Sequence, residues 1–189
     1  MRRATILIVI IITALTLGRT ARAQKSADVS ESYAKAVAIY NFTKLVDWPA
    51  TAFPAPESPV IICVLGDDPF AAELGQSVDG KKVNGRKLVS KKIKWSKDIR
   101  EFKDCNMLYI ASAESAHGDE VIQALKGTPV LTIADFPDFA KHGGIINFFL
   151  EDSTLRFAIN VESAKQSDLA ISSRLLSLSK ITPTGSSWR

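Results

Sequence analysis

The feature that most constrains the fold is a series of short, uninterrupted apolar runs with helical segments between them. Runs of this length are typical of strands buried on both faces of a parallel sheet. They are Val60–Leu65, Met107–Ala111, Pro129–Ile133 and Ile145–Leu150. Lys87–Ile93 alternates in polarity and predicts a further strand. Strands that alternate with helices indicate an α/β domain with a largely parallel sheet.

Helices are expected between these runs. Ser30 is the predicted N-cap of the first one, and its apolar face is expected to include Tyr33 and Val37. Asp68 is placed to cap a second helix, with Pro69 in its first position. The expected helical ranges are Ser30–Asp47, Phe70–Ser77, Ser115–Lys126, Phe136–Lys141 and a final region from Asn160, its predicted cap, to Lys180.

The last two strands are expected to form a hairpin. Ile145–Leu150 is followed by the turn Glu151–Ser153 and then by Leu155–Ile159, where apolar residues alternate with others. This pattern predicts an antiparallel pair. The predicted fold class is therefore α/β, with a mixed, largely parallel sheet closed by a C-terminal β-hairpin.

The N-terminus has the three parts of a secretory signal peptide. Two arginines follow Met1, an uncharged apolar run covers Ala4–Gly18, and Ala21 and Ala23 form a small-x-small pattern before Gln24. The alternative is an uncleaved anchor, but the apolar run is shorter than the roughly 20 residues of a membrane span. We expect cleavage after Ala23, one domain over residues 24–182, a loose tail over residues 183–189, and a periplasmic location.

The net charge of +4 comes from the signal peptide, which holds Arg2, Arg3, Arg19 and Arg22. The mature chain keeps 20 basic and 20 acidic residues and is neutral. The basic isoelectric point therefore gives no reason to expect a nucleic acid partner.

The mature chain has two cysteines, Cys63 and Cys105. An even number in an oxidising compartment favours a disulfide. The alternative is two buried free thiols, because Cys63 lies inside an apolar run where a thiol can pack. A metal site is disfavoured, since neither cysteine has a second cysteine or a histidine at ligand spacing.

The sequence contains no recognised catalytic motif. His117 and His142 lie in no catalytic pattern, and no nucleophile–base pair or phosphate-binding loop can be named. We therefore expect no catalytic residue, no cofactor and no metal.

A ligand crevice is expected where strands end, because α/β folds bind ligands at the carboxyl ends of their strands. The candidate crevice residues are Asp67, Asp68, Ser112 and Glu114. The alternatives for the two aspartates are a capped turn, which the sequence favours, and a metal site.

Ten basic residues gather between Lys81 and Lys103, against two acidic ones. This segment is a candidate docking surface for an acidic partner or for lipid headgroups. The alternative is a solvated edge strand, where lysines block unwanted strand pairing. The candidate partner-binding residues are Lys91, Lys92, Lys94, Trp95 and Lys97.

Five stretches in order resemble the YfiR family. They are Tyr33–Lys44 with Val46–Pro49, Cys63–Phe70, Cys105–Ile110, Gly143–Asn160 and Ile171–Leu176. The resemblance covers about Tyr33–Lys180. It implies a Rossmann-like, three-layer fold in a periplasmic protein. It also places Cys63 and Cys105 where the family has a disulfide, whereas a second family pair has no counterpart because Gly143–Asp152 contains no cysteine.

The resemblance also implies a function. The best-known member of the family is a dimeric repressor that binds the periplasmic part of an inner-membrane diguanylate cyclase. An outer-membrane lipoprotein sequesters that repressor and releases the cyclase, which controls cyclic-di-GMP and biofilm formation. Related domains occur in sensor kinases, so a sensor kinase is an alternative partner, and a homodimer is an expected state.

Three hypotheses for function follow. The first is a non-enzymatic periplasmic regulator that acts by protein–protein contact. The second is a periplasmic domain that senses a small molecule in the crevice at its strand ends. The third, a hydrolase, is the weakest because no catalytic pair is present.

Overall fold

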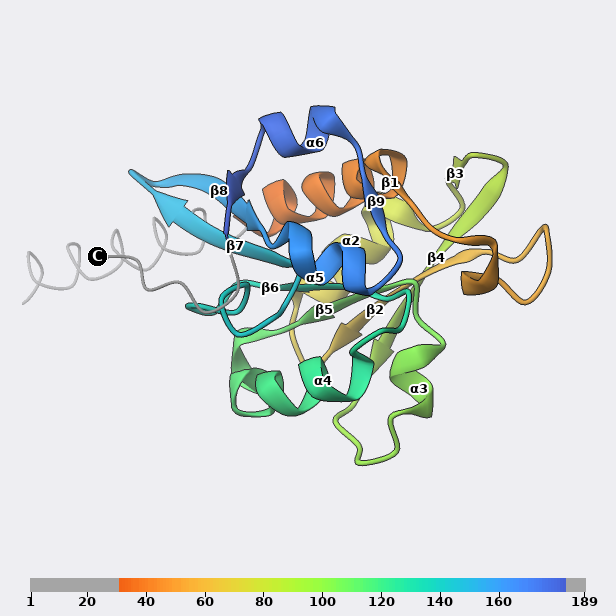
Figure 1. Cartoon of the computed structure of the whole chain (residues 1–189), viewed down its shortest axis with the longest axis horizontal. Helices are drawn as coiled ribbons and strands as arrows, with labels where there is room; N and C mark the ends of the chain where they lie inside the picture. Colours follow the sequence, from red (N-terminus) through yellow and green to blue (C-terminus); the bar gives the residue numbers. More distant parts are fainter. Residues whose placement is uncertain (1–30, 183–189) are drawn as a thin grey trace, which may run out of the picture.

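One long sheet organises the domain in the computed structural model, which describes residues 31–182 (Figure 1). The described part contains an eight-stranded sheet. In sheet order its strands are β10 (Lys180–Ile181), β8 (Thr154–Ile159), β7 (Ile146–Glu151), β6 (Leu131–Ala134), β5 (Met107–Ile110), β2 (Val60–Leu65), β4 (Arg86–Ile93) and β3 (Lys82–Val83). A separate antiparallel pair joins β1 (Val46–Asp47) to β9 (Ala170–Ile171).

The centre of the sheet is parallel, as the apolar runs predicted. Strands β4, β2, β5, β6 and β7 run in one direction, while β3 pairs antiparallel to β4, β8 pairs antiparallel to β7, and β10 runs parallel to β8. In chain order, β2 is the first strand of this sheet; β3 and β4 then join it on one side, and β5 joins it on the other. The strand order therefore reverses between β2 and β5, which is the place where such folds form a crevice.

Helices cover both faces of this sheet (Figure 1). One face carries the first helix (31–45), α2 (Phe70–Val78), α5 (Val161–Gln166) and α6 (Ser173–Ser177). The other carries α3 (Arg100–Lys103), the 3-10 helix η2 (Ser112–His117) and α4 (Gly118–Leu125). A second short 3-10 helix, η1, spans Ala50–Ala52. The predicted three layers are thus present.

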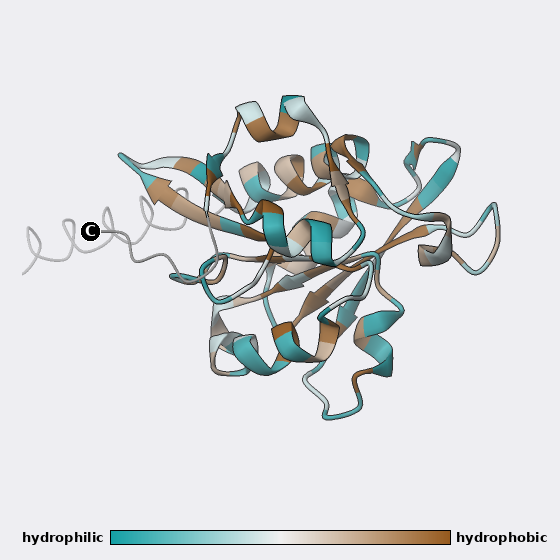
Figure 2. Cartoon of the chain, in the orientation of Figure 1, coloured by the Kyte–Doolittle hydropathy of each residue, from teal (hydrophilic) through white to brown (hydrophobic). Residues whose placement is uncertain are grey.

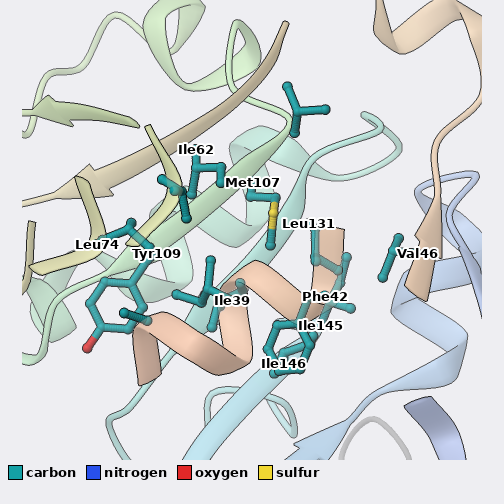
Figure 3. Close-up of a cluster of buried hydrophobic side chains, with 14 of the residues drawn as sticks. Ile39, Phe42, Val46, Ile62, Leu74, Met107, Tyr109, Leu131, Ile145 and Ile146 are labelled. Atoms are coloured by element: carbon teal, nitrogen blue, oxygen red, sulfur yellow. The ribbon is translucent and has the colours of Figure 1, made fainter. Parts of the chain in front are cut away.

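The larger core lies between the first helix and the sheet. Figure 3 shows Ile39 and Phe42 of that helix beside Ile62, Met107 and Ile146 of the strands. All five side chains are buried. Burial of this apolar surface is the main force that holds the helix on the sheet.

Local capping signals were predicted correctly. The Asp68 carboxylate accepts a hydrogen bond from the Phe70 backbone N–H at 2.8 Å at the start of α2. The Asn160 side chain accepts one from the Ser163 N–H at 2.9 Å at the start of α5. Each side chain satisfies a donor that the first turn of a helix leaves unpaired.

The final helical region was predicted wrongly as one element. Asp168 adopts a left-handed conformation with φ of 52° directly after α5, which ends that helix. The chain then forms β9, and Ser172 caps a new helix, α6, before the chain reaches β10. Leu169 and Ile171 stand two residues apart, which is the period of a strand, but so short a segment before the leucines of α6 was included in the expected helix.

Three further expectations need correction. Phe136–Lys141 forms turns instead of a helix, because Asp138 has a left-handed φ of 63°. Tyr33 and Val37 lie at the border of the buried stripe and are 59% and 37% exposed. Strands β7 and β8 pair antiparallel, but β10 lies outside β8, so this pair does not close the sheet.

The predicted signal peptide, the Ser30 cap and the predicted tail lie outside the described residues. Within residues 31–182, no helix has the length and apolar character needed to cross a membrane.

Candidate functional site

The predicted crevice residues do not meet in one pocket. The Asp67 side chain is 92% exposed and pairs with Lys92, while Asp68 is used as the cap of α2. Both line a shallow groove beside β4. The Ser112 hydroxyl turns the other way and donates to the Asp135 carboxylate at 2.5 Å.

Glu114 fills the position where a ligand would approach the switch point of the sheet. Gly66 follows β2 there with φ of 108°, and a Cβ on this residue would lie 2.8 Å from Cγ of Glu114. The glutamate therefore packs directly over the glycine. Access of a ligand to the Gly66 backbone would require Glu114 to move.

A buried polar network lies beside this position and was not predicted. Its centre is Asp135, which follows β6. One carboxylate oxygen accepts hydrogen bonds from Lys35 Nζ at 2.5 Å and from the Tyr109 hydroxyl at 2.6 Å, and the other accepts from Ser112. Lys35 also forms an ion pair with Glu31 at 2.6 Å. The network joins the first helix to the carboxyl ends of β5 and β6.

The network fixes the charges of its members. Burial alone would raise the pKa of the Asp135 carboxyl, but the bonds from Lys35, Ser112 and Tyr109 outweigh burial and hold that pKa below its usual value. Burial would likewise lower the pKa of Lys35, yet its bonds to Asp135 and Glu31 raise it. Burial and the Asp135 charge both raise the pKa of Tyr109. At neutral pH the network thus holds a carboxylate, an ammonium and a neutral phenol.

A cavity of about 510 Å³ opens next to Lys35 and Asp135. Its walls are mainly apolar and include Phe149, Leu155 and Ala158 from the β7–β8 pair. Thr182 also lines it; this residue is 2% exposed, and among residues 31–182 its hydroxyl has no hydrogen-bond partner. A small amphipathic molecule would find apolar walls, a hydroxyl and a charged border here.

The basic segment lies at the opposite end of the sheet, along β4 and the loop that leads to α3. Figure 2 shows mostly hydrophilic residues on both elements. Lys91, Lys94 and Lys97 are exposed. Within residues 31–182 they form no ion pair, whereas Lys92 pairs with Asp67. Three of the four predicted lysines thus make no direct ion pair in the described residues, although Lys94 is close enough to attract Asp67.

Trp95 is held inside a stack of rings. The His117 ring lies parallel to it at 4.1 Å between centroids, and Phe102 stacks on it at 5.8 Å. Phe102 is fully buried. The position of Trp95 therefore fixes the lysine-bearing loop against α3 and η2.

Cys63 and Cys105 form a disulfide with a Cα–Cα distance of 5.9 Å, so the alternative of two free thiols does not hold in this structure. Cys63 lies in β2, and Cys105 lies just before β5, its neighbour in the sheet. Among the described residues, no group of three or more histidine, cysteine or acidic side chains is placed to hold a metal ion.

Lys35, Tyr109 and Asp135 were missed by the sequence analysis. One signal was available: Lys35 stands four residues before Ile39 and so occupies the stripe that faces the core. A lysine there must pair with an acid or have its charge exposed. The sequence contains no indication of which acid it meets, since Asp135 is 100 residues away.

The comparison with protein-family models found a match to one family. A family model described as YfiR/HmsC-like matches residues 32–180. The comparison with curated proteins gave no match. The matched range begins in the first helix and ends at β10, so it includes the basic segment and all the cavity-lining residues except Glu31 and Thr182.

Proposed function

The chain belongs to the YfiR/HmsC-like family, and from this premise we propose that it is an exported, non-enzymatic regulator that restrains a membrane signalling enzyme by direct contact. The proposed partner is the periplasmic part of an inner-membrane diguanylate cyclase, with cyclic-di-GMP and biofilm formation as the output. A sensor kinase is the alternative partner. We include an outer-membrane lipoprotein that relieves the restraint, and a homodimer, in the same proposal.

The observation that carries this proposal is the family match over nearly the whole described domain. Two features support it. The Cys63–Cys105 disulfide suits an oxidising compartment such as the periplasm. The N-terminal sequence has the pattern of an export signal.

The proposed partner-binding residues are the exposed lysines of the basic segment. Lys91, Lys94 and Lys97 are exposed and form no direct ion pair within residues 31–182, so they can attract an acidic partner, whereas Lys92 would have to leave Asp67 to do the same. We assign Trp95 the role of holding this loop in place, because its ring stacks on both Phe102 and His117.

Crosslinking in living cells followed by affinity purification tests the proposal. The tagged, exported chain is crosslinked, the envelope is solubilised, and recovered proteins are identified by mass spectrometry. We expect a membrane protein with a cytoplasmic cyclase or kinase domain. Recovery of soluble proteins alone would count against a regulator of a membrane enzyme.

A second function is favoured by one specific observation, the cavity beside Lys35 and Asp135. A sensor of small amphipathic molecules would use its apolar walls and the Thr182 hydroxyl, which has no hydrogen-bond partner in the described part of the chain. Thermal unfolding in the presence of a metabolite panel tests this function. A ligand should raise the melting temperature of the wild-type protein but not of Ala158→Phe, which fills the cavity. No stabilisation by any compound would remove this alternative.

A further inference from the structure

The two faces of β4 are covered differently. Helix α2 packs over the face that carries Leu88 and Ser90, where Gly75 comes so close that an added Cβ would lie 3.2 Å from Ser90 Oγ. Lys87, Val89 and Lys91 alternate with these residues and point to the other face. All three are exposed, and Val89 is 39% exposed despite its apolar side chain.

Lys94 and Lys97 follow β4 in the chain and are also exposed. They belong to the loop that Trp95 holds against Phe102 and His117, and Phe102 belongs to the core cluster on the α3 side. We call Lys87, Val89, Lys91, Lys94 and Lys97 the β4 basic face. Within residues 31–182 its four lysines form no direct ion pair: nearby Asp67 and Asp98 pair with Lys92 and Arg100, and Asp67 also attracts Lys94 without touching it.

The backbone edge of β4 is closed to an added strand along the same stretch. The Leu88 N–H donates to the Lys81 carbonyl at 2.8 Å, and the Ser90 N–H donates to the Asp79 carboxylate at 2.6 Å. A partner that binds by strand addition needs such groups free. A ligand of this face must therefore contact side chains.

A lipid surface suits this face poorly. Stable membrane binding usually adds an inserted apolar or aromatic group to the charge attraction. Trp95 and Phe102 are the aromatic residues between Lys81 and Lys103, and both are engaged in the ring stack. Four exposed lysines without a direct ion pair and one exposed valine match a chain segment that carries several carboxylates around one apolar side chain.

We propose that the β4 basic face is the docking site for an acidic segment of the partner protein, with Val89 covered by an apolar residue of that segment. This inference rests on the proposed function, because it names the surface and the chemistry by which the regulator holds its membrane partner. The lysines supply long-range attraction, and the contact at Val89 supplies the desolvated centre.

Site-specific photo-crosslinking tests the inference in the full exported chain. The photoreactive residue p-benzoylphenylalanine replaces Val89 in one strain and Leu178 in a control strain; Leu178 is 62% exposed but lies outside this face. The crosslinked peptide is then sequenced. We expect a protein crosslink from position 89 alone, to a segment with net negative charge. Crosslinks to lipid, to a neutral or basic segment, or equally from both positions would overturn the inference.

Charge reversal provides the matched control. Lys87→Glu with Lys91→Glu should lower the crosslink yield from position 89 on the order of tenfold. Lys126→Glu with Lys165→Glu makes the same charge change at exposed lysines elsewhere and should leave the yield unchanged. Equal yields from both variants would contradict the proposal, and thermal melting confirms that both fold.

If the wild type captures its membrane partner while position 89 gives no crosslink, the docking site is wrong and the proposed function stands. If the wild type captures no membrane protein, both fail.

Discussion

At the scale of single residues, Asp135 does most to connect separate parts of the chain. It accepts hydrogen bonds from the first helix, from β5 and from η2 through Lys35, Tyr109 and Ser112. The Lys35 and Asp135 side chains are only 10% and 13% exposed. An ion pair at this depth is costly to break, because the charge that remains has lost its partner and cannot reach water.

We expect Asp135→Asn to lower the free energy of unfolding by roughly 3 kcal/mol, because Lys35 stays buried with Glu31 as its single acidic partner. Urea unfolding measures the change. Glu151→Gln is the control, since Glu151 pairs with Lys180 and Arg156 at the surface, and such pairs add little to stability. Equal effects of the two substitutions would show that the network does not hold the first helix on the sheet.

The same network predicts a dependence on pH. The folded-state pKa of Asp135 lies below its usual value, so its contribution to stability is complete above the unfolded-state pKa and is lost as pH falls through the folded-state pKa. The stability difference between wild type and Asp135→Asn should be constant between about pH 5 and 8 and shrink below about pH 4. Unfolding curves across this range measure it; a difference that grows on acidification would reverse the sign and contradict the assignment.

Among the interactions of single residues, the sequence allowed only the helix caps and the disulfide to be predicted. Asp68 and Asn160 stand directly before helices, so their caps could be predicted. The two cysteines could be paired because the sequence has no others. Lys35 and Asp135 meet only after the sheet has assembled, and no local pattern specifies that contact.

At the scale of elements, buried strands were the most predictable part. A run such as Val60–Leu65 is apolar throughout and has no other low-energy location than the centre of a sheet. Short elements near the C-terminus were less predictable, because β9 and β10 each have two residues and depend on partners elsewhere in the chain. The cavity depends on these elements, since β10 and Thr182 form one of its walls.

The two helix caps in this region should differ in strength. Asn160 is fully buried, accepts from the Ser163 N–H and donates to the Ala140 carbonyl at 2.7 Å. Ser172 makes a single capping bond, to the Leu175 N–H at 3.2 Å. We expect Asn160→Ala to cost about 3 kcal/mol, through the lost cap and an unpaired buried carbonyl. Ser172→Ala should cost about 1 kcal/mol. Thermal unfolding compares them, and equal losses would disprove the account of Asn160.

At the scale of the whole molecule, the two candidate functional features lie at opposite ends of one sheet. The cavity uses β7, β8 and β10, and the β4 basic face lies at the other end. The disulfide lies near the basic face, because Cys63, Cys105 and Phe102 share one core cluster with the Trp95 stack beside it. The bridge therefore supports the part of the molecule that carries the proposed docking surface.

Loss of the disulfide should weaken the whole domain. The bridge joins residues 42 positions apart, and chain-entropy arguments assign a loop of this size about 4 kcal/mol. Cys63→Ser should lower the melting temperature strongly under oxidising conditions, and reduction of the wild type should have a similar effect. Thiol labelling of unfolded, unreduced protein from the periplasm should find no free cysteine; two labelled thiols would contradict the bridge.

The measurement that tests the central claim most directly is the level of cyclic-di-GMP in cells. Deletion of the gene should raise that level, and expression of the full, exported chain should return it to the level of the undeleted strain. A version without residues 1–23, made in equal amount, should not restore it, because it cannot reach the periplasmic part of a membrane enzyme. An unchanged level after deletion, or equal restoration by the version without residues 1–23, would contradict the account of an exported regulator of a membrane cyclase.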